Sequence, residues 1–254
     1  MDTQQQILFN VLLIGDTCTD RYNIGSVDRL SPEAPVPVLK IVDTYDVPGM
    51  ASNVNLNLIN LNISADFVTN NDPITKTRFI DERSGQHLLR VDDEPKITGW
   101  SGDIPFPLEH YDAIVVSDYN KGFLTYEHIQ NLIHDFNGPV FIDTKKKNLE
   151  AFNGAYVKIN EKEFEAAESY AWDMIVTLGA NGAMLRSELV SANYATKKVD
   201  VVDVCGAGDT FLAALTYQYL VTNSIEEAIK FANKASSITV QHVGNYAPTL
   251  GEIE

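Results

Sequence analysis

The chain has 254 residues, a formal net charge of −16, 44% hydrophobic residues and 21% charged residues. This length can bury a sizeable core as one large domain or two small ones, and the composition is ordinary for a soluble globular protein. The charge argues against a nucleic acid or an anionic membrane as partner, because the summed field repels polyanions.

In the first half of the chain, an apolar run over residues 7–16 closes on Gly-Asp, which is typical of a strand buried on both faces of a parallel sheet. Residues 29–47 are rich in proline and then in β-branched residues, so we predict edge strands or a flap there. The apolar residues from 51 to 61 favour a mostly buried helix, and a short strand follows at 65–69. Two strand-like segments at 75–81 and 86–92 flank ERSG and predict a hairpin.

The second half alternates strands and helices more plainly. We predict short buried strands at 113–118, 139–143, 156–160 and 174–179, with helices after the first and third, and an antiparallel pair at 183–187 and 191–196. The run VDVVDV (199–204) is predicted as a strand that leads into a helix, and Ser224 with Glu227 predicts a capping box for the last helix.

Alternating strands and helices predict an α/β fold with a largely parallel sheet. In such sheets ligands bind at the carboxyl ends of the strands. Polar and glycine residues cluster at those predicted ends: Gly15-Asp16, Ser117-Asp118, Asp143, Asn160 and Gly179. A binding site is therefore expected along this edge.

The only two cysteines, Cys18 and Cys205, lie far apart and form no zinc-type or C-x-x-C pattern, which favours a reducing compartment. The N-terminal apolar run has no basic flank and no small-residue cleavage site, and no stretch approaches the length of a membrane span. We therefore expect a cytoplasmic protein.

The most informative stretch is DVCGAGDTFLAAL, from Asp203 to Leu215. A glycine-rich loop before a helix presents unobstructed amides and the positive end of the helix dipole, which together form an anion site. Asp209 could accept a proton from a hydroxyl there while the amides stabilise a transferring phosphoryl group. The alternative is that Asp209 is only an acid at a helix start. The sequence has neither a Walker A loop nor a G-x-G-x-x-G fingerprint.

This stretch closely resembles the C-terminal signature of the ribokinase-like (PfkB) carbohydrate kinases. RLSPEAPVPV, VSDYNKG, FIDTK and KINEKEFE resemble, in the same order, the branch that phosphorylates the anomeric hydroxyl of D-glycero-β-D-manno-heptose 7-phosphate. The resemblance implies a single domain over 1–254: a three-layer sandwich with a mostly parallel sheet and a small β lid at about 19–47 and 75–93. It also implies an ATP-dependent carbohydrate kinase, a phosphotransferase with an alcohol acceptor.

The resemblance assigns Asp209 as the catalytic base and Gly206, Ala207 and Gly208 as the anion hole. For substrate binding it implies Gly49 and Asn53. Asp20 could accept hydrogen bonds from sugar hydroxyls, Lys121 and Lys145 could offset the charge of a substrate phosphate, and Arg78 and Arg90 could reach the 7-phosphate if the lid closes. Several of these have simpler alternatives: Asp20 as a loop acid, Asn53 as a helix N-cap, the two arginines as exposed strand charges, and Lys145 as part of a solvated run with Lys146 and Lys147.

For the nucleotide side the resemblance implies Asn160, Thr177, Gly179, Gly182 and Asn233, with Asn160 and Glu163 holding Mg²⁺ through water. Asn233 has the alternative of a helix surface residue. Related kinases often use K⁺ near the strand before GAGD. A homodimer through the lid is the implied assembly.

The sequence departs from the family in four respects. Met50 replaces the second glycine of a double glycine, DTKKKN (143–148) replaces a D-P-K-G pattern, and a helix and a strand are missing between residues 71 and 74. Another helix is nearly absent between Ala167 and Met174. Two other hypotheses therefore stay open: a kinase of the same family for a different sugar, sugar phosphate or nucleoside, and a non-catalytic binding protein derived from a kinase.

Overall fold

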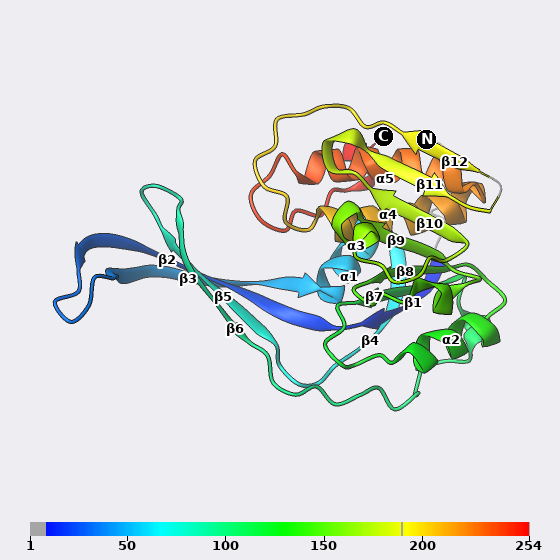
Figure 1. Cartoon of the computed structure of the whole chain (residues 1–254), viewed down its shortest axis with the longest axis horizontal. Helices are drawn as coiled ribbons and strands as arrows, with labels where there is room; N and C mark the ends of the chain where they lie inside the picture. The colour runs from blue at the N-terminus through cyan, green and yellow to red at the C-terminus, as the bar shows by residue number, and fades with distance from the viewer. Residues whose placement is uncertain (1–8, 189, 254) are drawn as a thin grey trace, which may run out of the picture.

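The computed structural model describes residues 9–188 and 190–253, so the first two residues of the predicted 7–16 strand and the N-terminal segment considered as a signal peptide lie outside it. At its centre is an eight-stranded sheet in the order β12-β11-β10-β9-β8-β7-β1-β4 (Figure 1). Six strands are parallel: β1 (Phe9–Gly15), β4 (Ile63–Thr69), β7 (Ala113–Asp118), β8 (Val140–Thr144), β9 (Tyr156–Asn160) and β10 (Asp173–Thr177). β11 (Ala183–Arg186) is antiparallel to β10, and β12 (Ser191–Tyr194) is antiparallel to β11. The prediction of an α/β fold with a mostly parallel sheet is confirmed.

Both faces of this sheet are buried, as β1 illustrates. Val11 and Leu13 face one hydrophobic cluster, whereas Leu12 and Ile14 face another, because successive side chains point to opposite faces. The first face packs against α1 (Ala51–Asn60), α4 (Ala207–Thr222), α5 (Ile225–Thr239) and α6 (Leu250–Ile253). The second packs against α2 (Tyr126–Asp135), α3 (Glu161–Glu165) and the short 3₁₀ helix η2 (Leu149–Phe152). Two further 3₁₀ turns are η1 (Leu108–His110) and η3 (Gly179–Asn181).

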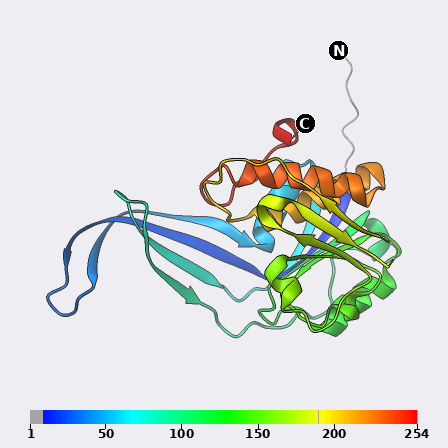
Figure 2. The ribbon, with the colours of Figure 1, turned by 45° about the horizontal axis from the view of Figure 1, so that its top comes forward.

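A second sheet of four strands projects from the body on one side (Figures 1 and 2). Its order is β3-β2-β5-β6, with β2 at Thr17–Leu30, β3 at Pro37–Met50, β5 at Thr75–Asp81 and β6 at His87–Asp93. β3 is an edge strand, and Pro32 and Pro35 lie in the turn that precedes it, where a missing amide costs no ladder bond. The apolar pattern did not single out β2 as a strand, although most of β2 lies within the β lid that the resemblance implied at about 19–47.

Two predictions about local structure are wrong. Residues 199–204 form no strand: the amides of Val202 and Asp203 donate to the Val240 carbonyl at the end of α5, and Val202 is exposed. The capping box at α5 is only half formed. The Ser224 hydroxyl accepts from the Glu227 amide, but the Glu227 carboxylate pairs with Lys230.

Residues 70–74 alone connect β4 to β5, in keeping with the missing helix and strand that the resemblance led us to expect. A cavity of about 680 Å³ lies beside this short connection, against the outer face of α1 that carries Ser52, Asn55 and Ile59. Asp20, Asn53 and Asp209 do not line it, so the shortening leaves an opening beside the candidate site rather than within it. In the described part of the chain, no helix combines the length and apolar character needed to cross a membrane.

Candidate active site

The Asp209 carboxylate lies in the first turn of α4 and is held from two sides. Its Oδ2 accepts a hydrogen bond from Asn53 Nδ2 (2.8 Å), and its Oδ1 accepts one from the Tyr119 hydroxyl (2.9 Å). Gly206, the N-cap of α4, has φ +75°, a conformation that favours glycine, and a Cβ there would lie 2.8 Å from Asn53 Nδ2. The glycine therefore lets α1 approach α4 closely enough for Asn53 to reach the carboxylate.

The N-terminus of α4 lies beside this carboxylate. Thr210 is the first residue whose amide bonds back to the Gly206 carbonyl (2.9 Å), so the amides of Gly208 and Asp209 precede the regular helix bonds. A Cβ at position 208 would lie 2.9 Å from the Lys158 ammonium. The loop thus places two amides, the helix dipole and a lysine next to one carboxylate.

Burial dominates the protonation of Asp209. Desolvation raises the pKa of this carboxyl to about 6, and the negative charge of Asp143 acts in the same direction. The hydrogen bonds from Asn53 and Tyr119 and the charge of Lys158 lower the pKa and partly compensate. A carboxylate with a pKa near 6 is a stronger base than an ordinary aspartate and is still ionised at neutral pH.

A buried ion pair joins Lys158 in β9 to Asp143 in β8, with 2.6 Å between Nζ and Oδ2. Asp143 Oδ1 is buried and has no hydrogen-bond partner among the described residues. Our sequence analysis missed Lys158. The sequence pattern that could have identified it is a lysine inside the apolar strand YVKIN, because a lysine buried in a strand needs an anionic partner.

Asp20, Gly49 and Arg78 meet where the four-stranded sheet joins the body. Asp20 lies within β2 rather than beyond a strand end, and it pairs with Arg78 Nη1 at 2.6 Å in a nearly buried ion pair. A Cβ at Gly49 would lie 2.6 Å from Cys18 Sγ and would also contact the Asp20 carboxylate. Burial raises the pKa of the Cys18 thiol to about 12, with smaller influences from Asp20, Lys76, Arg78 and Asp209.

The start of α1 excludes the alternative that Asn53 is a helix N-cap. The helix N-cap is Met50 rather than Asn53, and it has no side-chain capping bond. Met50 has φ +56°, in the region that favours glycine, and its side chain is buried in the hydrophobic core with Cys18 and Ile74.

Besides Arg78, the three side chains predicted to bind a substrate phosphate each pair with a carboxylate, and one of them, Lys145, also lies near the Tyr119 ring. Lys121 pairs with Glu94 (2.7 Å), and Arg90 pairs with Asp92 on the same strand (2.6 Å). Lys145 pairs with Glu163, and its ammonium lies 5.2 Å from the Tyr119 ring centre.

Lys76 in β5, which we did not predict, lies 5.9 Å from the same ring centre. No ion pair within residues 9–188 and 190–253 includes it. The sequence could have indicated Lys76, because it lies two residues before Arg78 in the same strand and residues two apart in a strand share a face.

Asn160 and Glu163 form the capping box of α3. The Asn160 side chain accepts from the Glu163 amide, and the Glu163 carboxylate accepts from the Asn160 amide, both at 2.9 Å. The other Glu163 oxygen contacts Lys145, whose pKa is lowered by burial but raised overall by Asp143, Glu163 and Asp209. The described residues contain no group of three or more His, Cys, Asp or Glu side chains arranged to hold a metal directly.

A magnesium ion that keeps most of its waters and bridges phosphates fits this region. Such an ion needs only one or two carboxylates from the protein. Asp143 supplies a buried oxygen without a partner among the described residues, and Glu163 lies on the other side of Lys145.

The predicted nucleotide residues follow the end of β10. Thr177 is the last residue of that strand and pairs in register with Asn160 of β9. Gly179 and Gly182 both have positive φ, and a Cβ at Gly182 would clash with the Tyr194 carbonyl. Asn233 is not a helix surface residue: it is buried, and its Nδ2 donates to the Tyr194 carbonyl at 2.9 Å.

Comparison with known proteins agrees with this geometry. Residues 139–250 match the model of the pfkB family carbohydrate kinases. The bifunctional protein HldE of Vibrio vulnificus (strain YJ016) is 31% identical over 299 aligned residues, which cover 96% of this chain and 62% of the relative. The chain thus spans less than two thirds of that relative's length.

Two solved structures share the fold. Phosphofructokinase-2 from Escherichia coli, in complex with potassium, superposes with a TM-score of 0.74 at 17% identity and covers 96% of this chain and 97% of its own. Ribokinase from Arabidopsis thaliana, complexed with ribose and ATP, gives 0.72 at 14% identity and covers 97% of this chain and 98% of its own. The fold is ribokinase-like. Residues 139–250 are thus similar to the pfkB family carbohydrate kinases, a class of phosphotransferase with an alcohol group as acceptor.

Proposed function

We propose that this protein is an ATP-dependent sugar kinase in which Asp209 is the general base. One observation carries the proposal: a buried carboxylate, fixed by Asn53 and Tyr119, lies against free amides at the start of α4. Asp209 takes the proton of the attacking sugar hydroxyl, whose oxygen then forms the bond to the γ-phosphorus as the bond to ADP breaks. In the loop of Gly206, Ala207 and Gly208, the Ala207 amide donates to the Val204 carbonyl, so the free amides of Gly208 and Asp209, with the helix dipole, stabilise the charge that develops on the phosphoryl oxygens.

The substrate we propose is D-glycero-β-D-manno-heptose 7-phosphate, with transfer to its anomeric hydroxyl to give the 1,7-bisphosphate. The RLSPEAPVPV string and the similarity to HldE support this choice. Asp20, Gly49 and Asn53 would bind sugar hydroxyls, and the cations on the adjoining elements would bind the 7-phosphate. The ammonium groups of Lys76 and Lys145 lie 5.9 Å and 5.2 Å from the centre of the Tyr119 ring, whose hydroxyl contacts Asp209, so we favour these two lysines over Lys121 and Arg90.

For the cofactors we propose ATP and Mg²⁺. Thr177, Gly179, Gly182 and Asn233 would line the nucleotide side, and Asn160, Glu163 and Asp143 would hold the hydrated ion. Magnesium supplies charge neutralisation of the nucleotide phosphates, which matters on a protein of net charge −16. A potassium requirement is tested by comparing turnover in K⁺ with turnover in Na⁺.

We further propose a homodimer through the four-stranded sheet. This sheet exposes large apolar side chains, among them Ile41, Leu89 and Val91, which are 50%, 57% and 45% exposed. Exposed apolar residues gathered on one projecting sheet are typical of an interface.

The first experiment is ADP release from MgATP with a panel of acceptors: the heptose 7-phosphate, ribose, fructose 6-phosphate and adenosine. We expect turnover with the heptose phosphate and a loss of roughly 10²–10⁴-fold in Asp209→Asn, the usual contribution of a general base. Turnover of another acceptor would retain the kinase and reject the heptose assignment. ATP binding without turnover of any acceptor would favour the binding-protein hypothesis.

A further inference from the structure

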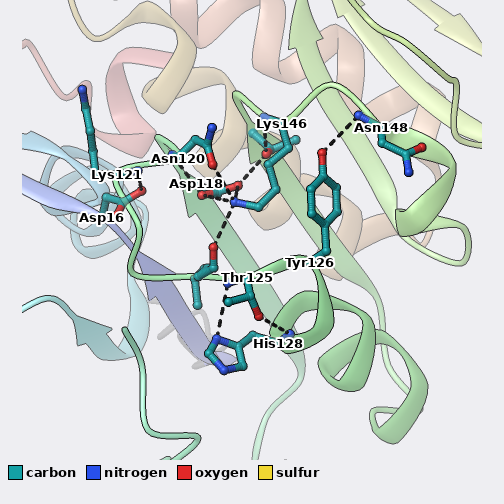
Figure 3. A network of polar contacts seen from close by, with 11 residues as sticks. Asp16, Asp118, Asn120, Lys121, Thr125, Tyr126, His128, Lys146 and Asn148 are labelled. Atoms are coloured by element: carbon teal, nitrogen blue, oxygen red, sulfur yellow. Dashed lines mark hydrogen bonds and ion pairs between the residues drawn. The ribbon is translucent and has the colours of Figure 1, made fainter. Parts of the chain in front are cut away.

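A buried lysine lies behind the candidate active site. Lys146, the middle residue of the predicted charge run, is only 8% exposed. Its ammonium donates to Asp118 Oδ1 (3.2 Å), Asn120 Oδ1 (3.1 Å) and the Leu124 carbonyl (2.9 Å), as Figure 3 shows for the two side chains. An ammonium has three donors, so each has a partner inside the protein.

The partner carboxylate is also saturated. Asp118 ends β7, its side chain is fully buried, and it accepts from the Thr144 hydroxyl (2.6 Å) and from the Asn120 amide (3.0 Å). A buried ion pair is costly to desolvate, so it contributes little net stability and is better explained by the geometry it enforces. The position of this lysine is also a departure from the family pattern, which has glycine after the lysine of D-P-K-G.

The geometry enforced here is that of the turn after β7. Tyr119 lies between Asp118 and Asn120, both of which bind Lys146, and Asn120 has φ +55°. A left-handed asparagine persists where surrounding contacts determine it. On the opposite side, Asp16 Oδ2 accepts from the Lys121 amide (3.3 Å), so the turn is held between β1 and the loop after β8 (Figure 3).

We propose that Lys146 is a positioning residue of the active site: by fixing the turn at 118–124, it holds the Tyr119 hydroxyl on the Asp209 carboxylate. This inference rests on the proposed role of Asp209 as the base. Lys146 touches neither Asp209 nor the predicted substrate residues, so it acts through Tyr119, whose hydroxyl donates to Asp209 Oδ1 at 2.9 Å.

Several other groups act on Asp209 and must be kept constant in a test. Asn53 on α1, Asp143 at the end of β8 and Lys158 on β9 all influence its pKa, and Lys145 and Cys18 interact with its charge. Because the Tyr119 hydrogen bond favours the ionised carboxylate, losing it raises the Asp209 pKa while these groups stay in place.

The experiment is a carboxyl ¹³C NMR titration of the ligand-free protein, with Asp209→Asn to assign the signal. We expect an Asp209 pKa of about 6 in the wild type. Tyr119→Phe should raise it by about 1, the effect of losing one hydrogen bond to a charged group. Lys146→Met should shift the Asp209 pKa in the same direction. The variant that combines Tyr119→Phe with Lys146→Met should shift this pKa no further than Tyr119→Phe alone. Lys147→Met, which removes the exposed neighbouring lysine, is the matched control and should leave the pKa unchanged.

Lys146→Met alone leaves Asp118 as an unpaired buried charge, so Asp118→Asn with Lys146→Met is measured beside it. In the kinase assay, the acidic limb of the kcat/KM pH profile should move to higher pH in Lys146→Met and in the Asp118→Asn, Lys146→Met double variant. If Lys146 had a purely structural role, its substitution would lower the melting temperature and leave this limb at its wild-type pH. A folded Lys146 variant with a wild-type Asp209 pKa would overturn the proposal, as would a Tyr119→Phe variant whose pKa is unchanged. The titration needs no turnover, so a failed kinase assay would overturn only the proposed function.

Discussion

At the scale of single residues, Asp209 is placed where burial opposes its charge. The unfolded chain ionises this group near its ordinary pKa of 3.8, but the folded protein does so only at about 6. Between these values the folded state binds more protons than the unfolded state, so the free energy of unfolding falls as the pH rises through this window. The stabilising contribution is fully present below about pH 4 and is lost above about pH 6.

We therefore predict that the wild type loses stability relative to Asp209→Asn between pH 4 and pH 7, by up to about 3 kcal/mol. Urea denaturation of both proteins across this range measures the difference. Glu150→Gln, which changes an exposed acid, should show no comparable trend. A stability difference that stays constant with pH would contradict the raised pKa of Asp209.

Lys76 gives a second prediction at this scale. Its ammonium lies beside Tyr119 and takes part in no ion pair within the described residues, so Lys76→Met should remove a direct contact to the sugar phosphate. We expect KM for the sugar phosphate to rise about 10- to 100-fold, the value of a hydrogen bond to a charged group, with kcat changed much less. Lys40→Met, on the exposed part of β3, is the control. An unchanged KM would remove Lys76 from the phosphate site.

At the scale of elements, three helices are joined by buried polar side chains behind the base. Asn57 of α1 accepts from the Thr210 hydroxyl of α4 (2.8 Å), and Thr239 of α5 donates to Thr210 (3.1 Å). Asn57 Nδ2 also donates to the Asn53 carbonyl (2.8 Å), one turn earlier in α1. This chain of hydrogen bonds sets the position of α1, and hence of Asn53, against the start of α4.

Asn57→Ala should leave these groups unsatisfied in a site without solvent and lower the free energy of unfolding by roughly 1–3 kcal/mol. Chemical denaturation measures the loss. Ile59→Ala, on the exposed side of the same helix, should change the stability by no more than about 0.5 kcal/mol. Equal effects of the two substitutions would show that the polar contacts do not hold α1.

The element scale also shows where sequence patterns were insufficient. Ser224 and Glu227 have capping-box spacing, but Lys230 competes successfully for the Glu227 carboxylate. Asn160 and Glu163 have the same spacing and form the complete box that the family comparison had led us to interpret only as a magnesium motif. Spacing identifies which groups can meet, whereas neighbouring charges decide which of them do.

At the scale of the whole molecule, the four-stranded sheet has two unlike faces. Asp20 and Arg78 lie on the face that meets the active site. The strand register places Ile41, Leu89 and Val91 on the opposite face, in line with Gly25, Asn23 and Arg21 respectively. The side facing away from the site is therefore the apolar one.

If this face forms a dimer, Ile41→Glu combined with Leu89→Glu should convert the protein to a monomer, because two charges would be buried without partners. Sedimentation equilibrium gives the mass of each form. Val243→Glu, which places the same charge on an exposed apolar residue in the loop after α5, should leave the assembly unchanged. A wild-type protein that sediments as a monomer at micromolar concentration would reject the interface.

The sequence by itself determined the layered α/β fold and the position of Asp209 at a helix start, because both depend on local signals: apolar runs of strand length, helical periodicity and a glycine-rich turn. Only the tertiary structure showed that Tyr119 and Asn53 bind the Asp209 carboxylate, that Lys158 and Lys146 are buried in ion pairs, and that Lys121 and Arg90 are already paired. Asn53 and Asp209 are separated by 156 positions, and no periodicity links them. The groups that a charged side chain contacts depend on which strand ends lie beside it. The order of the strands in space is decided only when the sheet folds.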